Sequence, residues 1–180
     1  MKKKRNKSGF GSWFFILAIV IASGCFYYYL SKSVAETVKT ELKVYFLRGD
    51  QLVVAKRGIS LQASTSIIRQ SETALKYLIT GPTTMEKIMG IFSEVPDDIN
   101  VLGVRQEGGT LRVNFDSKFI DFGSGSAGIQ AAIAQIVYTL TELKKINRVR
   151  FLIEGQEREL IIGKEGYVID RALSRRDINI

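Results

Sequence analysis

Three glycines ahead of a long apolar segment are the first residues in this chain whose spacing could do chemistry. Gly123, Gly125 and Gly128 spell G-x-G-x-x-G, the loop with which dinucleotide-binding proteins hold a pyrophosphate at a helix N-terminus. That loop must directly follow a strand, and it needs an acidic residue about twenty positions later on a second strand. Here the preceding strand is expected to end near Phe115, and Glu142 belongs to the helix itself. The pattern therefore predicts a loop that enters a helix, with no nucleotide and no cofactor bound.

Carboxylates and nucleophiles offer no stronger catalytic pattern. Asp97 and Asp98 are neighbours in a turn beside Pro96, which is a poor arrangement for acid–base catalysis. Asp116 and Asp121 could bind a cation, but capping of local helices explains them better. The chain has no histidine, which removes histidine-based triads and the commonest zinc and copper ligands. We therefore expect no catalytic, cofactor-binding or metal-binding residues.

Positive charge is concentrated at the start of the chain. The formal net charge is +8, and Lys2, Lys3, Lys4, Arg5 and Lys7 supply five of these charges, which leaves +3 for the rest. A region so close to neutral lacks the concentrated basic face that phosphate backbones need. We therefore expect no nucleic-acid partner.

The apolar segment after this basic run explains the charges. Eighteen residues from Trp13 to Leu30 carry no charge, and such a length crosses a hydrocarbon core as a slightly short helix. Basic flanks stay in the cytoplasm, so the chain beyond Leu30 is expected outside the cell. The sequence thus predicts a single-pass cell-membrane protein. Its parts are a cytoplasmic segment at 1–12, a membrane helix at 13–30, a stalk at 31–42 and an exported domain at 43–178.

Cys25 offers a second route to the same location. Residues 21–25, Ile-Ala-Ser-Gly-Cys, resemble the lipobox of bacterial lipoproteins, in which the cysteine is acylated and becomes the mature N-terminus. The apolar sequence Phe-Tyr-Tyr-Tyr-Leu that follows favours an uncleaved anchor, because a lipid-anchored protein usually continues with a flexible polar tether. Both alternatives place the domain at the outer face of the membrane. Cys25 is the only cysteine, so no disulfide can form within the domain.

Alternation and helical spacing divide the exported part into short elements. Alternation predicts strands at 43–48, 51–58, 101–106, 110–115, 148–153 and 159–162. Helical spacing predicts a helix from Ser66 to Thr80, and Thr83 with Glu86 forms a capping box that begins another short helix. The charged residues near the C-terminus are expected to form a solvated edge with local ion pairs. They are Arg171, Arg175, Arg176 and Asp177.

A helix at about 127–145 is the strongest periodic signal. Its apolar stripe consists of Ile129, Ala132, Ile133, Ile136, Val137, Leu140 and Leu143. The residues off this stripe are Gln130, Gln135, Thr141, Glu142 and Lys145. We expect this to be the central buried helix. The element order predicts an α+β fold with helices packed on one side of a small mixed β-sheet, preceded by one membrane helix.

Several segments taken together resemble the sporulation-and-germination domain of the GerM type. The resemblance spans about residues 43–178, and Ala172 stands where the family usually has a proline. Its motifs lie at 75–83 with Glu86, 91–96, 111–119, 135–142, 146–149, 153–155 and 170–175. The resemblance implies a compact α+β module, similar in fold to the ring-building modules of envelope-spanning channels, without catalytic motif residues. In spore formers, such proteins are implicated in germination and in assembling the channel between mother cell and forespore.

Composition and resemblance together favour a non-catalytic interaction module of the bacterial cell envelope. It is expected to be anchored in the membrane and to assist the assembly of an envelope complex or a sporulation or germination process. Its partner is expected to be an unidentified envelope protein or a second copy of the chain. The alternative is an extracytoplasmic enzyme or ligand-binding protein that acts on cell-wall or lipid material. Convergent buried carboxylates in a cleft would favour that alternative.

Overall fold

The structure is a computed structural model of the chain. It describes residues 10–32, 37–62, 65–121, 125–157, 159–164 and 166–179.

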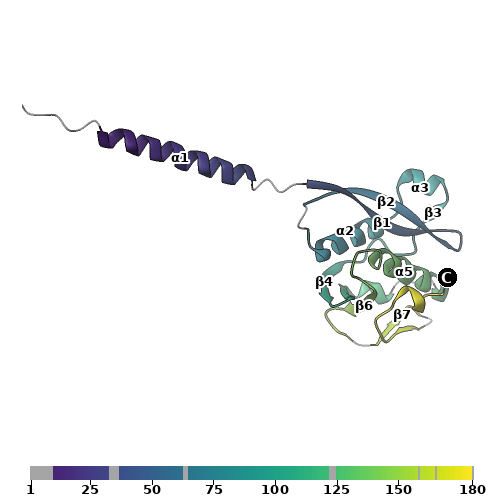
Figure 1. The fold of residues 1–180 in the computed structure, drawn as a ribbon. Coiled ribbons are helices and arrows are strands. Elements are labelled where there is room, and N and C mark those ends of the chain that lie inside the picture. Colours follow the sequence, from purple (N-terminus) through teal and green to yellow (C-terminus); the bar gives the residue numbers. More distant parts are fainter. Residues whose placement is uncertain are drawn as a thin grey trace, which may run out of the picture.

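Helix α1 (Phe10–Lys32) contains the apolar segment and stands apart from the folded body (Figure 1). Trp13 and Leu30 lie within this helix, and Cys25, also within it, is exposed. Residues 16–28 are exposed. Within the described residues, no helix combines the length and the apolar character needed to cross a membrane. The expected helix is present, whereas a membrane-spanning role for it is not shown.

The folded body begins with a long β-hairpin. Strands β1 (Thr37–Arg48) and β2 (Gln51–Gln62) pair antiparallel along their whole length. Gly49 makes the turn between them with a φ of +60°, a conformation that suits glycine. The two-residue strand β3 (Ile91–Phe92) pairs with the other edge of β1, so the sheet order is β2-β1-β3. The hairpin is longer than expected, because residues 37–42, assigned to a stalk from the sequence, lie in β1.

A second sheet has the order β4-β5-β6 and is mixed. Strands β4 (Val101–Glu107) and β5 (Thr110–Phe115) form an antiparallel hairpin with an irregularity between Val101 and Gly103. Strand β6 (Arg148–Ile153) then pairs parallel to β5. These three strands match the alternation in the sequence. Their buried positions form one face, which packs on the core.

A third, two-stranded sheet follows near the C-terminus. Strands β7 (Leu160–Ile162) and β8 (Tyr167–Ile169) pair antiparallel. The last described element is the short 3-10 helix η1 (Arg175–Asp177). Strand β7 had been expected from the sequence, whereas β8 had not.

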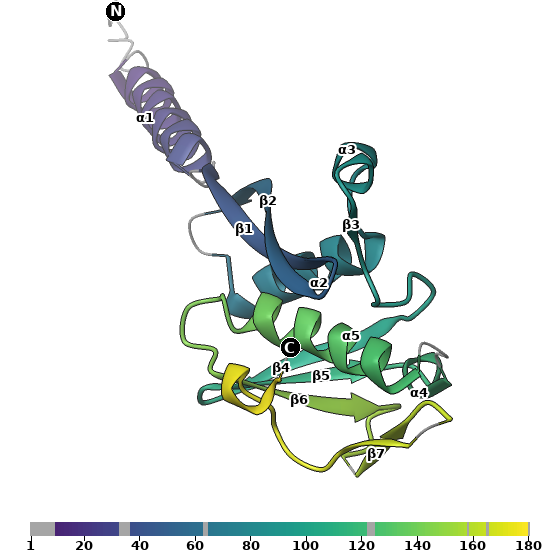
Figure 2. The same ribbon diagram turned by 90° about the vertical axis from the view of Figure 1, so that its right-hand side faces the viewer.

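Two helices occupy the space between the hairpin and the second sheet, as Figure 2 shows. Helix α2 (Ile67–Thr80) contacts β1 and β4, and helix α5 (Gly125–Leu140) contacts β1, β6 and α2. Ser66 caps α2, because its side chain accepts a hydrogen bond from the backbone N–H of Arg69 at 3.3 Å. The arrangement is therefore three layers: hairpin, helices and mixed sheet.

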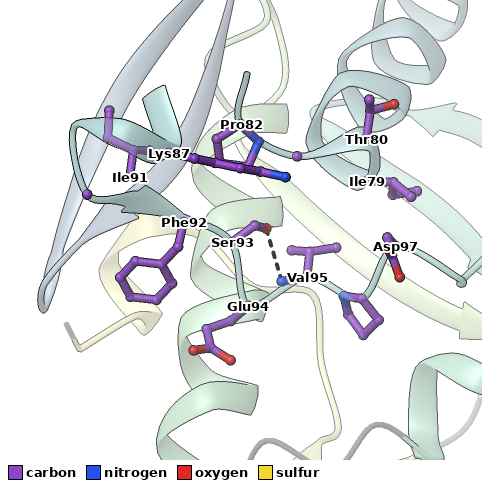
Figure 3. A pocket seen from close by; sticks show the side chains of 13 residues that line it. Ile79, Thr80, Pro82, Lys87, Ile91, Phe92, Ser93, Glu94, Val95 and Asp97 are labelled. Carbon is purple, nitrogen blue, oxygen red and sulfur yellow. Dashed lines mark hydrogen bonds between the residues drawn. The ribbon is translucent and has the colours of Figure 1, made fainter. Parts of the chain in front are cut away.

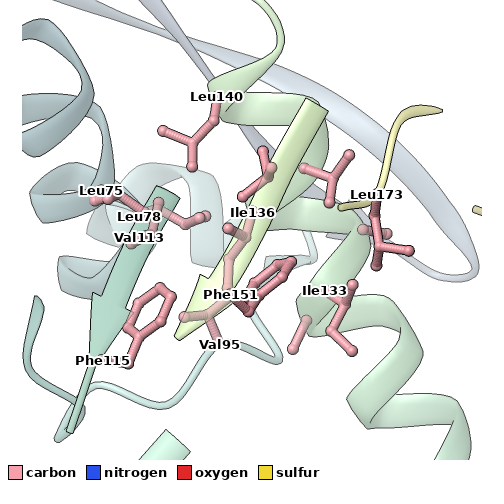
Figure 4. Packing of buried hydrophobic residues seen from close by; sticks show 14 of the residues in the cluster. Leu75, Leu78, Val95, Val113, Phe115, Ile133, Ile136, Leu140, Phe151 and Leu173 are labelled. Carbon is pink, nitrogen blue, oxygen red and sulfur yellow. The ribbon is translucent and has the colours of Figure 1, made fainter. Parts of the chain in front are cut away.

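The hydrophobic core is built around α5, as expected. All seven residues of its predicted apolar stripe are buried. Figure 4 shows part of this cluster, in which side chains of α5 meet Leu75 and Leu78 of α2 and Val113 and Phe151 of the second sheet. The short helix α4 (Lys118–Asp121) is held by Phe119. Its ring stacks on Phe115 at 4.4 Å and on Phe151 at 5.6 Å between centroids.

The prediction of one mixed sheet with helices on one side is correct only for the second sheet. The first hairpin does not join that sheet but covers the opposite side of α2 and α5. The reason lies in the edge of β1, whose backbone groups at Tyr45 bond to side chains of α5 instead of to another long strand. Helix α5 also ends at Leu140 instead of near Lys145. Lys145 adopts a φ of +71°, outside the helical region.

Candidate interaction site

Three polar side chains of α5 and the turn after it lie against strand β1. Gln135, Thr139 and Glu142 follow a spacing of four and three residues, which places them on one face. The hydroxyl of Thr139 accepts a hydrogen bond from the Tyr45 N–H at 3.0 Å, and Gln135 donates to the Tyr45 carbonyl at 3.2 Å. Gln135 and Thr139 are fully buried. They therefore satisfy backbone groups of β1 that neither β2 nor β3 reaches.

Gln135 also fixes the loop after β3. Its amide Nε2 donates to the hydroxyl of Ser93 at 3.2 Å, and its Oε1 accepts from the N–H of Glu94 at 2.9 Å. The Ser93 hydroxyl in turn accepts from the N–H of Val95 at 3.2 Å. One amide side chain thus joins the hairpin, the loop and the central helix. From the sequence, Gln135 was expected off the buried stripe. That expectation is wrong, because its polar groups are needed inside.

Glu142 is the centre of a charged cluster that gathers distant segments. Its Oε1 accepts from Lys43 at 2.6 Å, and its Oε2 accepts from Arg175 at 2.7 Å and from the Tyr45 hydroxyl at 3.0 Å. The guanidinium of Arg175 lies over the rings of Tyr45 and Tyr138, at 5.4 and 4.9 Å from their centroids. Arg175 was expected in a solvated edge with local ion pairs. It instead ties the C-terminus to α5 and β1.

The charges around Glu142 shift its titration. The hydrogen bond from Lys43, and next that from Arg175, lowers the pKa of Glu142 from 4.5 to about 2. Burial raises the pKa of the Tyr45 hydroxyl, and its hydrogen bond to Glu142 raises it further. Glu142 therefore carries its negative charge at neutral pH, where it pairs with Lys43 and Arg175.

Helix α3 (Thr84–Ile88) projects from the body at the end of β3 (Figure 2). The predicted capping box is confirmed: Thr83 Oγ1 accepts from the Glu86 N–H at 3.3 Å, and Glu86 accepts from the Thr83 N–H at 2.7 Å. Glu86 also receives two hydrogen bonds from Arg57 of β2, at 2.7 and 2.8 Å. The Arg57 bonds lower the pKa of Glu86 to about 2. This nearly buried pair, which the sequence did not reveal, fastens α3 to the hairpin.

An open groove of about 720 Å³ lies beside this helix, and Figure 3 shows its lining. It runs between the end of α2 at Ile79 and the loop from Phe92 to Asp97. Phe92 is 39% exposed. The same end of the molecule carries three further exposed apolar side chains. These are Met85 (64%), Ile88 (74%) and Met89 (51%). We call Met85, Ile88, Met89 and Phe92 the α3 patch.

The described part of the G-x-G-x-x-G segment, residues 125–128, belongs to the start of α5. Gly123 lies outside the described residues, and Gly125 is the first residue of α5, with a φ of +68°. Helix α4 separates β5 from this position. Glu142 lies just beyond the end of α5 and forms ion pairs with Lys43 and Arg175. Gly125 therefore lies at the entry to α5.

Two of the aspartates considered for acid–base or cation chemistry have local polar partners. Asp116 accepts from the Nδ2 of Asn100 at 2.7 Å, and Lys118 lies 3.5 Å from Asp98. In the described part of the chain, no group of three or more histidine, cysteine, aspartate or glutamate residues could hold a metal ion. Asp177 behaves as expected for a local partner, since it accepts from Arg171 at 3.0 Å.

Comparisons with known proteins agree with this architecture. The family described as "Germane: Sporulation and spore germination" matches residues 43–159. The spore germination protein GerM of Bacillus subtilis (strain 168) is 30% identical over 145 residues. The match covers 79% of this chain but only 37% of that relative, so the chain spans little more than a third of its length.

Solved structures show the same fold. The first GerMN domain of the sporulation protein GerM from Bacillus subtilis superposes with a TM-score of 0.56 and 25% identity, covering 77% of this chain and 99% of that one. The tandem GerMN domains of the same protein superpose with a TM-score of 0.55 and 18% identity, and the match covers 76% of this chain and 45% of that one. A putative lipoprotein from Clostridium perfringens superposes with a TM-score of 0.54 and 17% identity, and the match covers 81% of this chain and 92% of that one.

Proposed function

The chain belongs to the Germane family of sporulation and spore germination domains, and from this premise we propose that it is a non-catalytic interaction module of the bacterial cell envelope. In this proposal its N-terminal segment holds it at the cell membrane, and its domain lies outside the cytoplasm. There it assists the assembly of an envelope complex by binding an envelope protein or a second copy.

One observation carries the interaction role. The polar side chains at the centre of the domain are used to hold its own backbone, as Gln135 and Thr139 illustrate. The α3 patch, by contrast, presents four large apolar side chains to solvent, and one of them, Phe92, lines the groove. Clustered apolar exposure of this kind typically marks a contact surface. The exposed apolar side chains therefore suit the binding of a protein partner, whereas the central polar side chains are already bonded to the domain's own backbone.

The interaction role can be tested by crosslinking in intact cells, followed by identification of the captured proteins. We expect Ile88→Ser combined with Met89→Ser to reduce capture, because it removes the apolar surface without touching the Arg57–Glu86 pair that holds α3. Ile161→Ser is the matched control, since Ile161 is similarly exposed (61%) but lies on β7. Equal capture by the wild type, the double variant and the Ile161→Ser control would exclude the α3 patch. If none of these three proteins captures a partner, the interaction role is refuted.

Attachment to the membrane is proposed from α1 and the basic residues before it. The exposed side chains of α1 include Ile16, Leu17, Ile19, Val20 and Ile21, and leaving such residues in water is unfavourable by roughly 1.5–3 kcal/mol each. A cover is therefore needed, and a bilayer supplies it. Acylation at Cys25 is the second means of attachment, and the Clostridium perfringens structure described as a putative lipoprotein shares the fold.

The two means of attachment predict different mature proteins. If α1 is retained, membrane-bound protein keeps its N-terminal residues, and Cys25→Ala changes neither its size nor its location. If Cys25 is acylated, the mature protein begins at that cysteine and Cys25→Ala leaves an unprocessed form. Intact-mass measurement of protein from membranes distinguishes the two. Recovery of the full chain in the soluble fraction would refute both.

The alternative of a nucleotide-dependent enzyme makes a separate prediction. We expect neither NAD nor ATP to raise the melting temperature, because Gly125 serves the entry to α5. A nucleotide at a hundred times its dissociation constant would stabilise the native state by about 2.7 kcal/mol, a shift that a thermal scan resolves. Such a shift, lost on Gly125→Val, would support the enzyme instead.

A further inference from the structure

The outer edge of β4 is an unpaired strand edge. In the sheet order β4-β5-β6, strand β6 is bridged on its far side by Leu173, whose backbone exchanges two 2.8 Å hydrogen bonds with Val149. In the described part of the chain, no strand pairs with the other side of β4. Alternate residues of an edge strand direct their N–H and C=O groups outward, where another extended chain can bind them.

Two hollows flank this edge. One, of about 380 Å³, lies between β4 and α2, and its apolar lining includes Ile79, Ile99 and Leu102. The other, of about 510 Å³, lies on the outer face of the sheet beside Arg105 and Arg112. Leu102, which is 50% exposed, lines both hollows. An added strand would therefore have room for side chains on both of its faces.

The outer face of the sheet carries arginines in one cross-strand row. Arg105 pairs in register with Arg112, and Arg112 with Arg150, so all three side chains share a face. Like charges directly opposite one another are destabilising unless they are compensated. Carboxylates compensate two of the three: Glu107 and Glu157 both bind Arg112, and Glu157 lies 3.2 Å from Arg150.

Arg105 is the exception in this row. It is exposed and makes no side-chain hydrogen bond or ion pair with any described residue. It is also the member of the row that lies on the open edge. The next position along the row would be supplied by whatever strand pairs with β4.

We propose that the open edge of β4 binds an extended acidic segment of a partner protein by strand addition. The partner's backbone bonds to the outward groups of β4, and a glutamate or aspartate of the segment lies beside Arg105. Side chains alternate along a strand, so the residues on either side of this carboxylate face α2, and the one nearer to Gly103 lies at the hollow lined by Ile79, Ile99 and Leu102. The bound segment thus has an acidic residue next to an apolar one. This inference rests on the proposed interaction role and adds a second contact surface, the open edge of β4, to the α3 patch.

Site-specific crosslinking of the full chain tests the proposal. The photoreactive residue p-benzoylphenylalanine replaces Leu102, and in a separate protein it replaces Ile161 as an exposed control on β7. After irradiation of intact cells, the captured peptide is sequenced by mass spectrometry. We expect capture at position 102, and the captured partner segment should carry an acidic residue next to an apolar one.

Charge variants of the position-102 protein supply the decisive comparison. Arg105→Glu should reduce capture at least about fivefold, since it exchanges an ion pair for a repulsion, whereas Arg105→Lys should retain most of it. Arg148→Glu is the matched control, because Arg148 is an exposed arginine on β6, away from the open edge. A reduction with Arg105→Glu alone supports the proposal.

The remaining outcomes overturn the inference, and they separate it from the proposed function. Capture at 102 that ignores Arg105, capture of a second copy of this chain, or capture of a segment without an acidic residue each refutes it. If a general lysine crosslinker traps a partner but position 102 captures no more than position 161, the inference fails while the interaction role stands. If neither approach traps a partner, both fail.

Discussion

The α5–β1 contact and the outer face of the second sheet differ in whether their polar side chains all have partners within the domain. At the contact, Gln135 and Thr139 are fully buried, and hydrogen bonds occupy both of them. On the sheet, Arg112 and Arg150 meet carboxylates, while Arg105 is left to solvent. A buried group without a partner costs about 1–3 kcal/mol, whereas water satisfies an exposed guanidinium. The buried groups, Gln135 and Thr139, therefore stabilise the fold, whereas the exposed Arg105 is available to bind a partner.

The largest expected effect is on the apolar side of α5. Ile136→Ala should lower the free energy of unfolding by about 2–5 kcal/mol, because Ile136 is fully buried in the core and the truncation leaves a cavity. Urea unfolding of the full chain in mild detergent, followed by near-ultraviolet circular dichroism, measures this loss. Gln130→Ala, at a half-buried position of the same helix, should lower it by less than about 0.5 kcal/mol. Equal losses would show that the stripe is misassigned.

The next effect concerns the polar side of the same helix. Gln135→Ala should cost about 1–3 kcal/mol, since it leaves the Tyr45 carbonyl and the Glu94 N–H without their partner. Gln106→Ala provides the comparison, because Gln106 also donates to a backbone carbonyl, at 3.0 Å, but in an exposed turn. The same unfolding assay should give less than about 0.5 kcal/mol for it. Similar values for the two variants would contradict the distinction between buried and exposed polar groups.

The charged end of the contact predicts a pH dependence. The folded-state pKa of Glu142, about 2, lies below the ordinary value of 4.5. Its stabilisation is therefore fully present above about pH 4.5 and is lost as the pH falls toward 2. Glu142→Gln should lower the free energy of unfolding by about 1–3 kcal/mol at pH 7. This difference from the wild type should shrink steadily between pH 4.5 and 2.

Glu72→Gln is the control for that titration. Glu72 is an exposed glutamate of α2, and its replacement should change stability by less than about 0.5 kcal/mol. Unfolding curves at a series of pH values provide the measurement for both variants. A Glu142→Gln difference that persists unchanged at pH 2 would mean that the carboxylate charge is not the source of the stabilisation.

The smallest effect is expected at the open edge of β4. Arg105→Glu should change the free energy of unfolding by less than about 0.5 kcal/mol, because its side chain is exposed and unpaired among the described residues. A slight increase in the free energy of unfolding would also agree with a non-structural Arg105, since the substitution relieves repulsion along the arginine row. Thermal and urea unfolding both measure it. A loss above about 1 kcal/mol would place Arg105 with the structural groups and remove the contrast between the two regions.

Local patterns in the sequence were sufficient for most individual elements. The apolar stripe of α5, the hairpin around Gly49 and the capping box of Thr83 and Glu86 were all correctly predicted. Each depends on interactions between residues close in sequence, so spacing alone reveals it. The absence of histidine and the single cysteine likewise follow from composition.

The tertiary structure decided how distant segments share polar groups. The sequence placed Gln135 off the buried stripe and Arg175 at a solvated edge, yet both bond to segments tens of residues away. It also could not show that Arg105, Arg112 and Arg150 lie in one cross-strand row, because they become neighbours only through strand register. The division into separate sheets has the same origin. Register and layer order depend on which strand edges find partners, and short-range periodicity carries no information about that choice.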